Sequence, residues 1–413
     1  MSDSPQRALV IGAGVIGTAC AWFLRQAGLE VTVVDRNTIG SGCSFENCGY
    51  VCPSHVLPLT RPGVITTTLK AMMKSRSPLY VNPFVGPRLW RWLWQFSRHC
   101  RHDHMIEAGS ARYALLQSSQ DLYRQLIREQ DLDCDWHERG LLVVYEDAHG
   151  LDAAHKENEL LERHWGVSAD PLDGPGLVDL EPTLKEGLAG GMHFTEDTHL
   201  DPGRLMRSWR ALNEAHGVTY REQCPVTGFK RDGDRVIAAD TPDGPIEADT
   251  FVLATGALAP ELGRQLGRQL AIQPGKGYSL TTERPDPCPQ VPMIFHDHRV
   301  AVTPLSERYR LGSTMEFSGY DTSLNPRRLA LLEEGAARYL DMPRGETILS
   351  RWYGWRPMSA TGLPVITLSP NCPNVCLAVG HSMVGTSMAP GTGRLVAELV
   401  TGAQPHVDPA PYA

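Results

Sequence analysis

The sequence predicts an α/β fold (α+β overall), in which one domain is built on a parallel sheet and a second domain on a mainly antiparallel sheet. Three observations support this prediction. A continuous apolar run at 8–11 leads into a glycine-rich turn and a helix-like segment. Two more apolar runs, at 250–254 and 375–379, also end in turns of small residues, as buried parallel strands do. Several segments between these runs alternate apolar and polar residues, which is typical of a sheet with one solvated face.

Length and composition are those of an ordinary folded protein. The chain has 413 residues, of which 42% are hydrophobic and 21% charged, and its net charge is −8. The length predicts about two or three domains, and the mild acidity argues against a nucleic-acid partner. Ten cysteines include no C-x-x-C pair, so we predict free thiols and no metal site. No apolar stretch reaches the roughly 20 residues that cross a bilayer and no signal peptide is evident, so we expect a cytoplasmic protein.

The first strand ends in Gly-Ala-Gly-Val-Ile-Gly, which matches the pattern G-x-G-x-x-G. A helix-like run follows, and a second strand at 31–34 ends at Asp35. Gly12 permits a tight turn, Gly14 lets the backbone approach a pyrophosphate, and Gly17 allows the helix to pack closely on the strand. Asp35 would accept hydrogen bonds from ribose hydroxyls. We therefore predict that the ADP part of a dinucleotide binds here.

A long loop follows directly after this acidic residue. Residues 36–53 are rich in Gly, Ser and Asn, and loops of this length inside a compact domain are usually functional. Ser44, Asn47 and Gly49 match the Gly-Ser-x-x-x-Ser-x-x-Asn-x-Gly loop that wraps the flavin in the FAD-dependent D-amino acid oxidase superfamily. The sequence most closely resembles the bacterial D-amino acid dehydrogenase branch of that superfamily, although Cys48 stands where a small residue is usual.

The resemblance extends along nearly the whole chain. Val226 matches a strand valine that contacts adenine, and 380–386 is similar to the family's Gly-His loop at the flavin edge. Ala360 and Thr361 depart from the family, which more often has Pro-Asp there. The segments similar to family motifs are 201–205, 225–229, 254–257, 273–280, 356–366 and 380–386.

The resemblance implies a discontinuous Rossmann-like FAD-binding domain (1–60, 196–270 and 350–413) and a substrate-binding domain (61–195 and 271–349). FAD is the implied cofactor. The residues expected to bind it are Gly12, Gly14, Val15, Ile16, Gly17, Asp35, Arg36, Ser44, Asn47, Cys48, Gly49, Val226, Thr255, Gly256, Gly380, His381, Met383, Gly385 and Thr386.

The implied reaction is oxidative deamination of an amino acid, most closely a D-amino acid. A hydride passes from the α-carbon to flavin N5, the imine hydrolyses to a 2-oxo acid and ammonia, and the electrons go to a quinone or another non-oxygen acceptor. Arg356 resembles the family's carboxylate-binding arginine, a task that suits the planar guanidinium because it donates two parallel hydrogen bonds. Further pocket candidates are Tyr278, Tyr353, His55, Glu46 and Lys276. For the two tyrosines, core packing is at least as good an interpretation.

Other functions stay open at this point. An enzyme of the same fold could act on proline, hydroxyproline or a secondary amine such as sarcosine. An NAD-dependent dehydrogenase would explain Asp35 but not the flavin-type loop or the Gly-His loop. A third alternative is a non-enzymatic membrane adaptor that has kept the flavin-binding fold, but this would not explain Arg356.

Residues 88–98 predict an amphipathic helix with three tryptophans. At 100° per residue its apolar side chains fill a face of roughly 200°, and arginines occupy the rest. Such a helix suits a membrane surface, while packing on the protein's own sheet is the simpler interpretation. Because the relatives donate electrons to a membrane-bound acceptor, peripheral contact with the inner face of the membrane stays open. The Pro-rich end, 405–413, is predicted to be a frayed tail.

Overall fold

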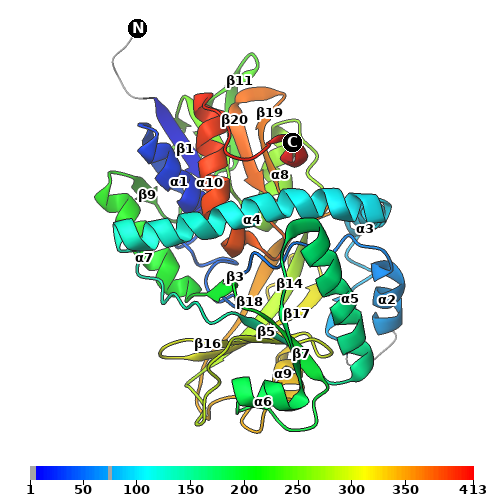
Figure 1. The fold of residues 1–413 in the computed structure, drawn as a ribbon. Helices are drawn as coiled ribbons and strands as arrows, with labels where there is room; N and C mark the ends of the chain where they lie inside the picture. The colour runs from blue at the N-terminus through cyan, green and yellow to red at the C-terminus, as the bar shows by residue number, and fades with distance from the viewer. Residues whose placement is uncertain (1–5, 73–76) are drawn as a thin grey trace.

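Two sheets dominate the computed structural model, which describes residues 6–72 and 77–413. A six-stranded sheet lies in the upper part of Figure 1 and a nine-stranded sheet in the lower part; we call them the parallel sheet and the large sheet. The long helix α4 (His102–Gln130) crosses the molecule between them. The predicted fold class is confirmed.

The parallel sheet has the strand order β19-β20-β13-β1-β2-β9, and all neighbours are parallel except β19 and β20. Strand β1 therefore has a neighbour on each side, and helices cover the sheet faces, which explains why its buried residues 8–11 are all apolar. The strands are β1 (Arg7–Ile11), β2 (Glu30–Val34), β9 (Thr219–Arg221), β13 (Thr250–Leu253), β19 (Val365–Ser369) and β20 (Cys372–Val379).

The large sheet is mainly antiparallel and has the order β18-β14-β17-β16-β15-β5-β7-β6, with β4 beside β17. Only the pairs β5–β15 and β4–β17 are parallel among its described strands. Its strands are β4 (Leu79–Val81), β5 (Leu141–Tyr145), β6 (Asp170–Asp173), β7 (Gly190–Phe194), β14 (Ile272–Thr282), β15 (Met293–Phe295), β16 (Val300–Pro304), β17 (Tyr309–Phe317) and β18 (Ile348–Ser359).

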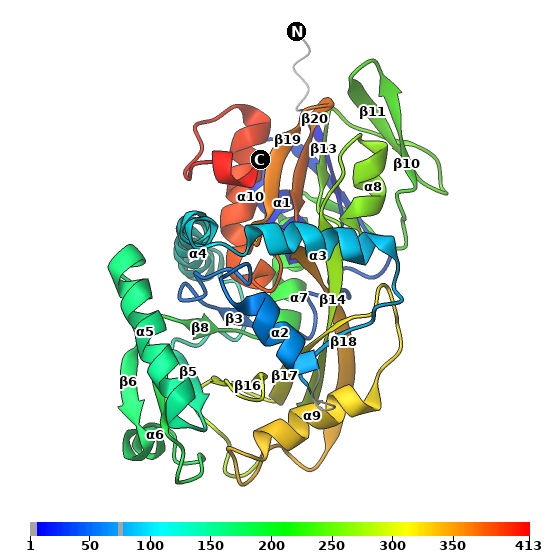
Figure 2. The same cartoon turned by 90° about the vertical axis from the view of Figure 1, so that its right-hand side faces the viewer.

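The helices lie around these sheets, and two small sheets complete the fold (Figures 1 and 2). Both Asp-Gly turns of the nucleotide part, at 232–233 and 243–244, connect strands of one small hairpin sheet. The remaining elements are α1 (Val15–Gln26), α2 (Val64–Met72), α3 (Pro87–His99), α5 (Ala148–Trp165), α6 (Gly174–Leu180), α7 (Pro202–Ala215), α8 (Ala259–Gln265), α9 (Pro326–Ala336), α10 (Gly385–Thr401), β3 (Tyr50–Val51), β8 (Thr198–His199), β10 (Gly228–Asp232), β11 (Arg235–Asp240), β12 (Ile246–Glu247), η1 (Gly256–Leu258) and η2 (Ala410–Tyr412).

Helix α10 begins at Gly385, earlier than the helix-like pattern at 394–400 indicates. Its first half contains Pro390, Gly391 and Gly393, which hide a helix from periodicity. These small residues have a packing role: an ideal Cβ on Gly393 would lie 2.6 Å from the backbone of Ala19 on α1. The two helices therefore approach more closely than larger side chains would allow.

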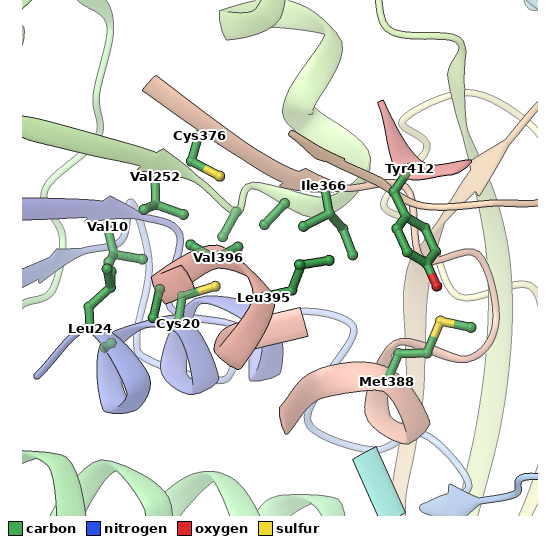
Figure 3. Close-up of a cluster of buried hydrophobic side chains, with 14 of the residues drawn as sticks. Val10, Cys20, Leu24, Val252, Ile366, Cys376, Met388, Leu395, Val396 and Tyr412 are labelled. Carbon is green, nitrogen blue, oxygen red and sulfur yellow. The ribbon is translucent and has the colours of Figure 1, made fainter. Parts of the chain in front are cut away.

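The apolar core beneath the parallel sheet holds the C-terminal end of the chain (Figure 3). Val10, Leu24 and Leu395 belong to this core, and Tyr412 joins them with 1% of its surface exposed. The Tyr412 hydroxyl donates a hydrogen bond to the carbonyl of Ala111 at 2.6 Å. The prediction of a frayed tail at 405–413 is therefore wrong, because one buried aromatic ring anchors the segment.

Two elements pack outside the domain to which the prediction assigns them. Residues 350–359, assigned to the FAD-binding domain, lie on β18 and pair with β14 in the large sheet. Helix α4, assigned to the substrate-binding domain, contributes Leu115 and Leu116 to the core shared with α1 and α10. The division into domains stays a prediction, with Arg356 on the side of the large sheet.

Candidate active site

A cavity of about 2220 Å³ lies between the two sheets. Typical small-ligand pockets enclose roughly 300–1,000 Å³, so this cavity has room for a large cofactor together with a substrate. Every residue predicted to bind FAD lines it except Gly17 and Gly380, which lie behind the lining. Arg356, Tyr278, Tyr353, His55 and Glu46 all border the same cavity. Segments far apart in the sequence thus converge on one space.

The glycine-rich turn after β1 is tightly packed. Gly12 has φ +105°, and an ideal Cβ on it would lie 2.5 Å from the carbonyl oxygen of Ala254. An ideal Cβ on Gly17 would lie 1.8 Å from the carbonyl oxygen of Gly12. Side chains at these two positions would push α1 away from the sheet. The turn needs glycine for the reasons that the dinucleotide pattern predicts.

Two helices direct uncapped N-termini at the cavity. Helix α1 starts after Gly14 and α10 after Val384; neither has a side-chain cap or an acidic residue in its first turn. The N–H of Val15 donates to Ser44 Oγ at 2.9 Å, and Ile16 borders the cavity beside it. The other N–H groups of the first turn and the positive end of the helix dipole suit a pyrophosphate at α1 and the electron-rich edge of a flavin at α10.

Asp35 is fixed at the carboxyl end of β2. Its Oδ2 accepts a hydrogen bond from the N–H of Ala13 and its Oδ1 from that of Asn37, both at 2.8 Å. Burial raises the pKa of Asp35, and these hydrogen bonds act in the opposite direction. The adjacent Arg36 is exposed and also borders the cavity. The carboxylate retains lone pairs for the hydroxyls of a ribose.

The loop after Asp35 is held to both sheets. Asn47 Oδ1 accepts the N–H of Gly49 at 2.8 Å, and the carbonyl of Asn47 accepts from Arg310 on β17. Gly49 has φ +69°, and an ideal Cβ there would lie 1.9 Å from the carbonyl oxygen of Leu200. The thiol of Cys48 occupies the space above Gly312 of the large sheet, so a cysteine fits where the family usually has a small residue.

The remaining predicted cofactor residues line the cavity from three loops. Val226 and the turn at Thr255–Gly256 border it, and the buried Thr255 Oγ1 has no hydrogen-bond partner in the described part of the chain. A buried hydroxyl left alone is expected where a ligand completes the hydrogen bond. Met383, Gly385 and Thr386 border the cavity at the start of α10.

His381 is buried in the loop before α10, and its Nε2 lies 3.0 Å from Thr392 Oγ1. Burial lowers the pKa of His381 to about 3, so the ring is neutral at ordinary pH. A neutral imidazole tied to α10 shapes the loop. Together with the glycine turn, the uncapped helix ends and the unpartnered Thr255 hydroxyl, this loop fits FAD.

Arg356 brings to the cavity a cation without an acidic partner. Its guanidinium lies over Gly277, where an ideal Cβ would come within 2.3 Å of Cζ. Arg356 Nη1 donates to the carbonyl of Thr314 at 2.8 Å, and among the described residues no carboxylate forms an ion pair with it. Burial lowers the pKa of Arg356, against the opposing effect of the nearby Cys43 and Cys48 thiols. The remaining N–H donors are free to bind a carboxylate.

The structure does not bring Tyr278 or Tyr353 to the Arg356 guanidinium. Gly275 pairs with Arg356 and Tyr278 with Tyr353, so strand alternation places the tyrosines on the opposite face of the large sheet. The Tyr278 hydroxyl donates to Glu316 at 3.2 Å, and its ring packs in the apolar core on that face. As a correction, neither tyrosine donates the second hydrogen bond beside Arg356. Lys276 lies on their face, with Nζ 4.8 Å from the Tyr353 ring centroid.

His55 and Glu46 are both on the cavity side. Burial lowers the pKa of His55 to about 4, and its carbonyl accepts a hydrogen bond from the buried Arg112 at 2.7 Å. The Ser350 hydroxyl donates to the Glu46 carboxylate, whose two oxygens lie 2.9 and 2.8 Å from Ser350 Oγ. His55 is therefore a neutral wall of the cavity, and Glu46 is already engaged by the large sheet.

Sequence reasoning missed two hydroxyls that line the cavity. Thr314 Oγ1 and Ser279 Oγ are buried without hydrogen-bond partners in the described residues. Thr314 follows Ser313, and both have positive φ, 48° and 113°, in a bulge between β14 and β17. No sequence pattern marks this bulge, because both residues are ordinary strand residues. The bulge turns the carbonyl of Thr314 toward Arg356.

The described residues contain neither a metal-binding cluster nor a membrane-spanning helix. Within residues 6–72 and 77–413, no group of three His, Cys, Asp or Glu side chains could hold a metal ion, and all ten cysteines are free. The described helices include none that is long and apolar enough to span a bilayer.

Known proteins resemble this chain in both sequence and fold. The family described as FAD dependent oxidoreductase matches residues 7–399. The chain is 35% identical over 408 residues to a D-amino acid dehydrogenase of Paramagnetospirillum magneticum, covering 96% of this chain and 95% of that one. It is 33% identical over 411 residues to a D-amino acid dehydrogenase of Xanthobacter autotrophicus, covering 98% and 97%.

Two solved structures show the same fold at lower identity. Glycine oxidase from Geobacillus kaustophilus has a TM-score of 0.78 at 23% identity, covering 99% of this chain and 98% of that one. L-proline dehydrogenase from P. horikoshii has a TM-score of 0.77 at 19% identity, covering 99% and 96%. A family that depends on FAD excludes the NAD-dependent alternative. The match along nearly the whole chain shows that this protein belongs to the family of FAD-dependent oxidoreductases, with FAD as its cofactor.

Proposed function

We propose that this protein is a dehydrogenase of D-amino acids. The observation that carries the proposal is Arg356, a buried guanidinium with free donors in the cavity that fits FAD. The two relatives that are 35% and 33% identical to this chain are both D-amino acid dehydrogenases. An unpaired buried cation is costly to keep, and an anionic substrate group would compensate its charge.

The chain's own residues would position the substrate. Arg356 binds the α-carboxylate through two parallel hydrogen bonds, and this holds the α-carbon at a fixed place in the cavity. The unpartnered hydroxyls of Thr314 and Ser279 supply further hydrogen bonds on the same face of the large sheet. The neutral ring of His55 does not repel a substrate amine.

FAD, when bound, accepts the hydride that leaves the α-carbon. The amine binds in its neutral form, so the chain needs no strong general base in the cavity. The imine product hydrolyses to a 2-oxo acid and ammonia.

Helix α3 supports a peripheral position at the inner face of the membrane. Its buried side packs within the protein, where Trp92 donates to the carbonyl of Met358 at 2.9 Å and borders the cavity. Its outer side exposes 54% of Trp90 and 57% of Trp94, and the preceding Phe84 is 91% exposed. Exposed arginines 88, 91 and 98 flank this aromatic patch. Tryptophans with arginines suit anionic lipid headgroups, and this placement would bring a membrane quinone close to the cavity.

A substrate panel tests the proposed function directly. The purified FAD-loaded protein is mixed, without oxygen, with an artificial dye acceptor and with both enantiomers of several amino acids. The panel includes proline, hydroxyproline and sarcosine. Dye reduction that is faster with D-amino acids than with their L-enantiomers supports the proposal. Reduction by sarcosine alone or by L-amino acids alone would show that the substrates belong to another class. If no compound reduces the dye, the proposed function is refuted.

A further inference from the structure

Arg299 places a second arginine in the cavity that holds Arg356. It is the last residue of the turn between β15 and β16, and it lines the cavity. Its φ is +54°, a left-handed conformation in which glycine or asparagine is usual and a long side chain is strained. Backbone strain at a cavity wall suggests that the side chain has a function there.

Arg299 and Arg356 lie on the same face of the large sheet. Val300 pairs with Ser313 and packs in the apolar core of the opposite face, so the preceding Arg299 lies on the cavity side. Continuing this register by one residue places Arg299 across from Thr314, whose carbonyl accepts a hydrogen bond from Arg356. Arg356 lies on β18, three strands from β16, but its guanidinium reaches over Gly277 of β14 to the Thr314 carbonyl on β17. Because neighbouring strands lie about 5 Å apart, Arg299 starts one strand from the carbonyl that Arg356 contacts.

The acidic groups around Arg299 are engaged elsewhere. Glu157 forms an ion pair with Arg61 at 2.8 Å. Asp297 Oδ2 accepts the N–H of Glu146 at 2.9 Å and the Tyr339 hydroxyl at 3.1 Å. In the part of the chain that the structure describes, Arg299 itself has no hydrogen bond and no ion pair within 4 Å.

The other neighbours do not compensate the Arg299 charge. His296 stacks near Tyr145 at 4.7 Å between ring centroids, and burial lowers its pKa to about 4, so it is neutral at ordinary pH. Burial lowers the pKa of Arg299 and the positive charge of Arg61 acts in the same direction, while Tyr145, Glu157 and Asp297 act in the opposite direction. An anion arriving in the cavity would therefore find free donors at Arg299.

We infer that Arg299 binds a second anionic group of the substrate, so that the preferred substrates are amino acids with an acidic side chain. This inference rests on the proposed function and names its substrate class: Arg356 holds the α-carboxylate and Arg299 the side-chain carboxylate. Neutral side chains of the same size would leave Arg299 unpaired.

The test compares D-glutamate with D-glutamine, which differ in charge but hardly in shape. Wild type should have a higher kcat/KM for D-glutamate. Arg299→Gly suits the left-handed backbone, so it should fold, and it should reduce the D-glutamate to D-glutamine ratio about 10- to 100-fold. Arg299→Lys should restore part of the ratio. The control Arg235→Leu removes an exposed arginine of the β10–β11 hairpin and should leave the ratio unchanged.

A binding measurement separates this inference from the proposed function. Glutarate and butyrate are titrated into the FAD-loaded protein, and the flavin absorption spectrum reports binding without turnover. Tighter binding of glutarate that Arg299→Gly abolishes supports the inference even if no amino acid is oxidised. Oxidation of D-amino acids with a D-glutamate to D-glutamine ratio that Arg299→Gly does not change would overturn the inference and leave the proposed function intact.

Discussion

Replacing Arg356 with leucine should reduce catalytic efficiency strongly while leaving the protein folded. The guanidinium uses one N–H for the Thr314 carbonyl and has no acidic partner among the described residues. A carboxylate held by the remaining donors would form two charge-assisted hydrogen bonds. Their loss should cost about 2–4 kcal/mol, or about 30- to 1000-fold in kcat/KM. The cost to stability should be about 1 kcal/mol, since one hydrogen bond is lost and no ion pair is broken.

The assay for Arg356→Leu is dye-coupled oxidation of D-amino acids, with flavin content measured on the same sample. Arg351→Leu is the matched control, because Arg351 lies exposed on β18 and strand alternation places it on the opposite face from Arg356. Arg356→Lys keeps the charge but not the planar fork, so it should recover only part of the efficiency. If Arg356→Leu retains its FAD and its kcat/KM for every substrate, the carboxylate-binding role is refuted.

Three further predictions concern the cofactor site, the buried His381 and the outer side of helix α3. Asp35→Ala should weaken FAD binding about tenfold, because the carboxylate accepts the Ala13 N–H of the glycine turn and is predicted to accept hydrogen bonds from the ribose. Equilibrium dialysis measures the FAD affinity, and an unchanged affinity would contradict the assignment. His381 has its pKa lowered from 6.5 to about 3, so the unfolded chain binds a proton that the folded one does not, and stability is lost as pH falls below about 6.5. At pH 5 the free energy of unfolding should be about 2 kcal/mol lower than at pH 7 because of His381. Urea unfolding at both pH values should show that His381→Gln lacks this decrease. An equal pH dependence in wild type and variant would count against the prediction. Trp90→Ser with Trp94→Ser should reduce flotation with anionic vesicles, whereas the control Ile237→Ser, on an exposed part of β11, should not; equal flotation would exclude α3 as the contact.

The cofactor half of the cavity could be predicted because its requirements are local. An ideal Cβ on Gly12 or Gly17 would lie 2.5 or 1.8 Å from a backbone oxygen, so only glycine fits at either position. Such a requirement leaves a fixed glycine spacing in the sequence. Asp35 follows its strand directly, so its place at the sheet edge was implied by the strand itself. Two further motifs, one in the loop after Asp35 and one in the loop before α10, predict where the flavin end of the cofactor lies.

The substrate half could not be predicted as well, because it depends on which face each strand residue takes. All residues of β14 are buried, so no alternation of polar and apolar residues shows where Tyr278 points. Thr314 lies in a bulge formed by two non-glycine residues with positive φ, and no sequence pattern predicts such a bulge. Arg299 occupies a turn whose left-handed residue is usually glycine, so the sequence gives no reason to place it in the cavity.

A single buried residue can also fix a segment that its composition predicts to be disordered. The end of the chain is rich in proline and was expected to fray, but Tyr412 inserts its ring into the core of α1 and α10. One side of helix α3 packs on the protein, where Leu89 and Trp92 are buried. The other side exposes Trp90 and Trp94, as a membrane-facing helix would. A helical wheel gives the width of an apolar face but not how much of it the protein covers.

The absorption spectrum of the FAD-loaded protein after anaerobic addition of a D-amino acid tests the central claim most directly. A cavity that holds FAD beside a carboxylate-binding Arg356 predicts that the oxidised flavin band disappears with a D-amino acid and much more slowly in Arg356→Leu. A purified protein that binds no flavin, or a flavin band that no amino acid bleaches, would contradict it.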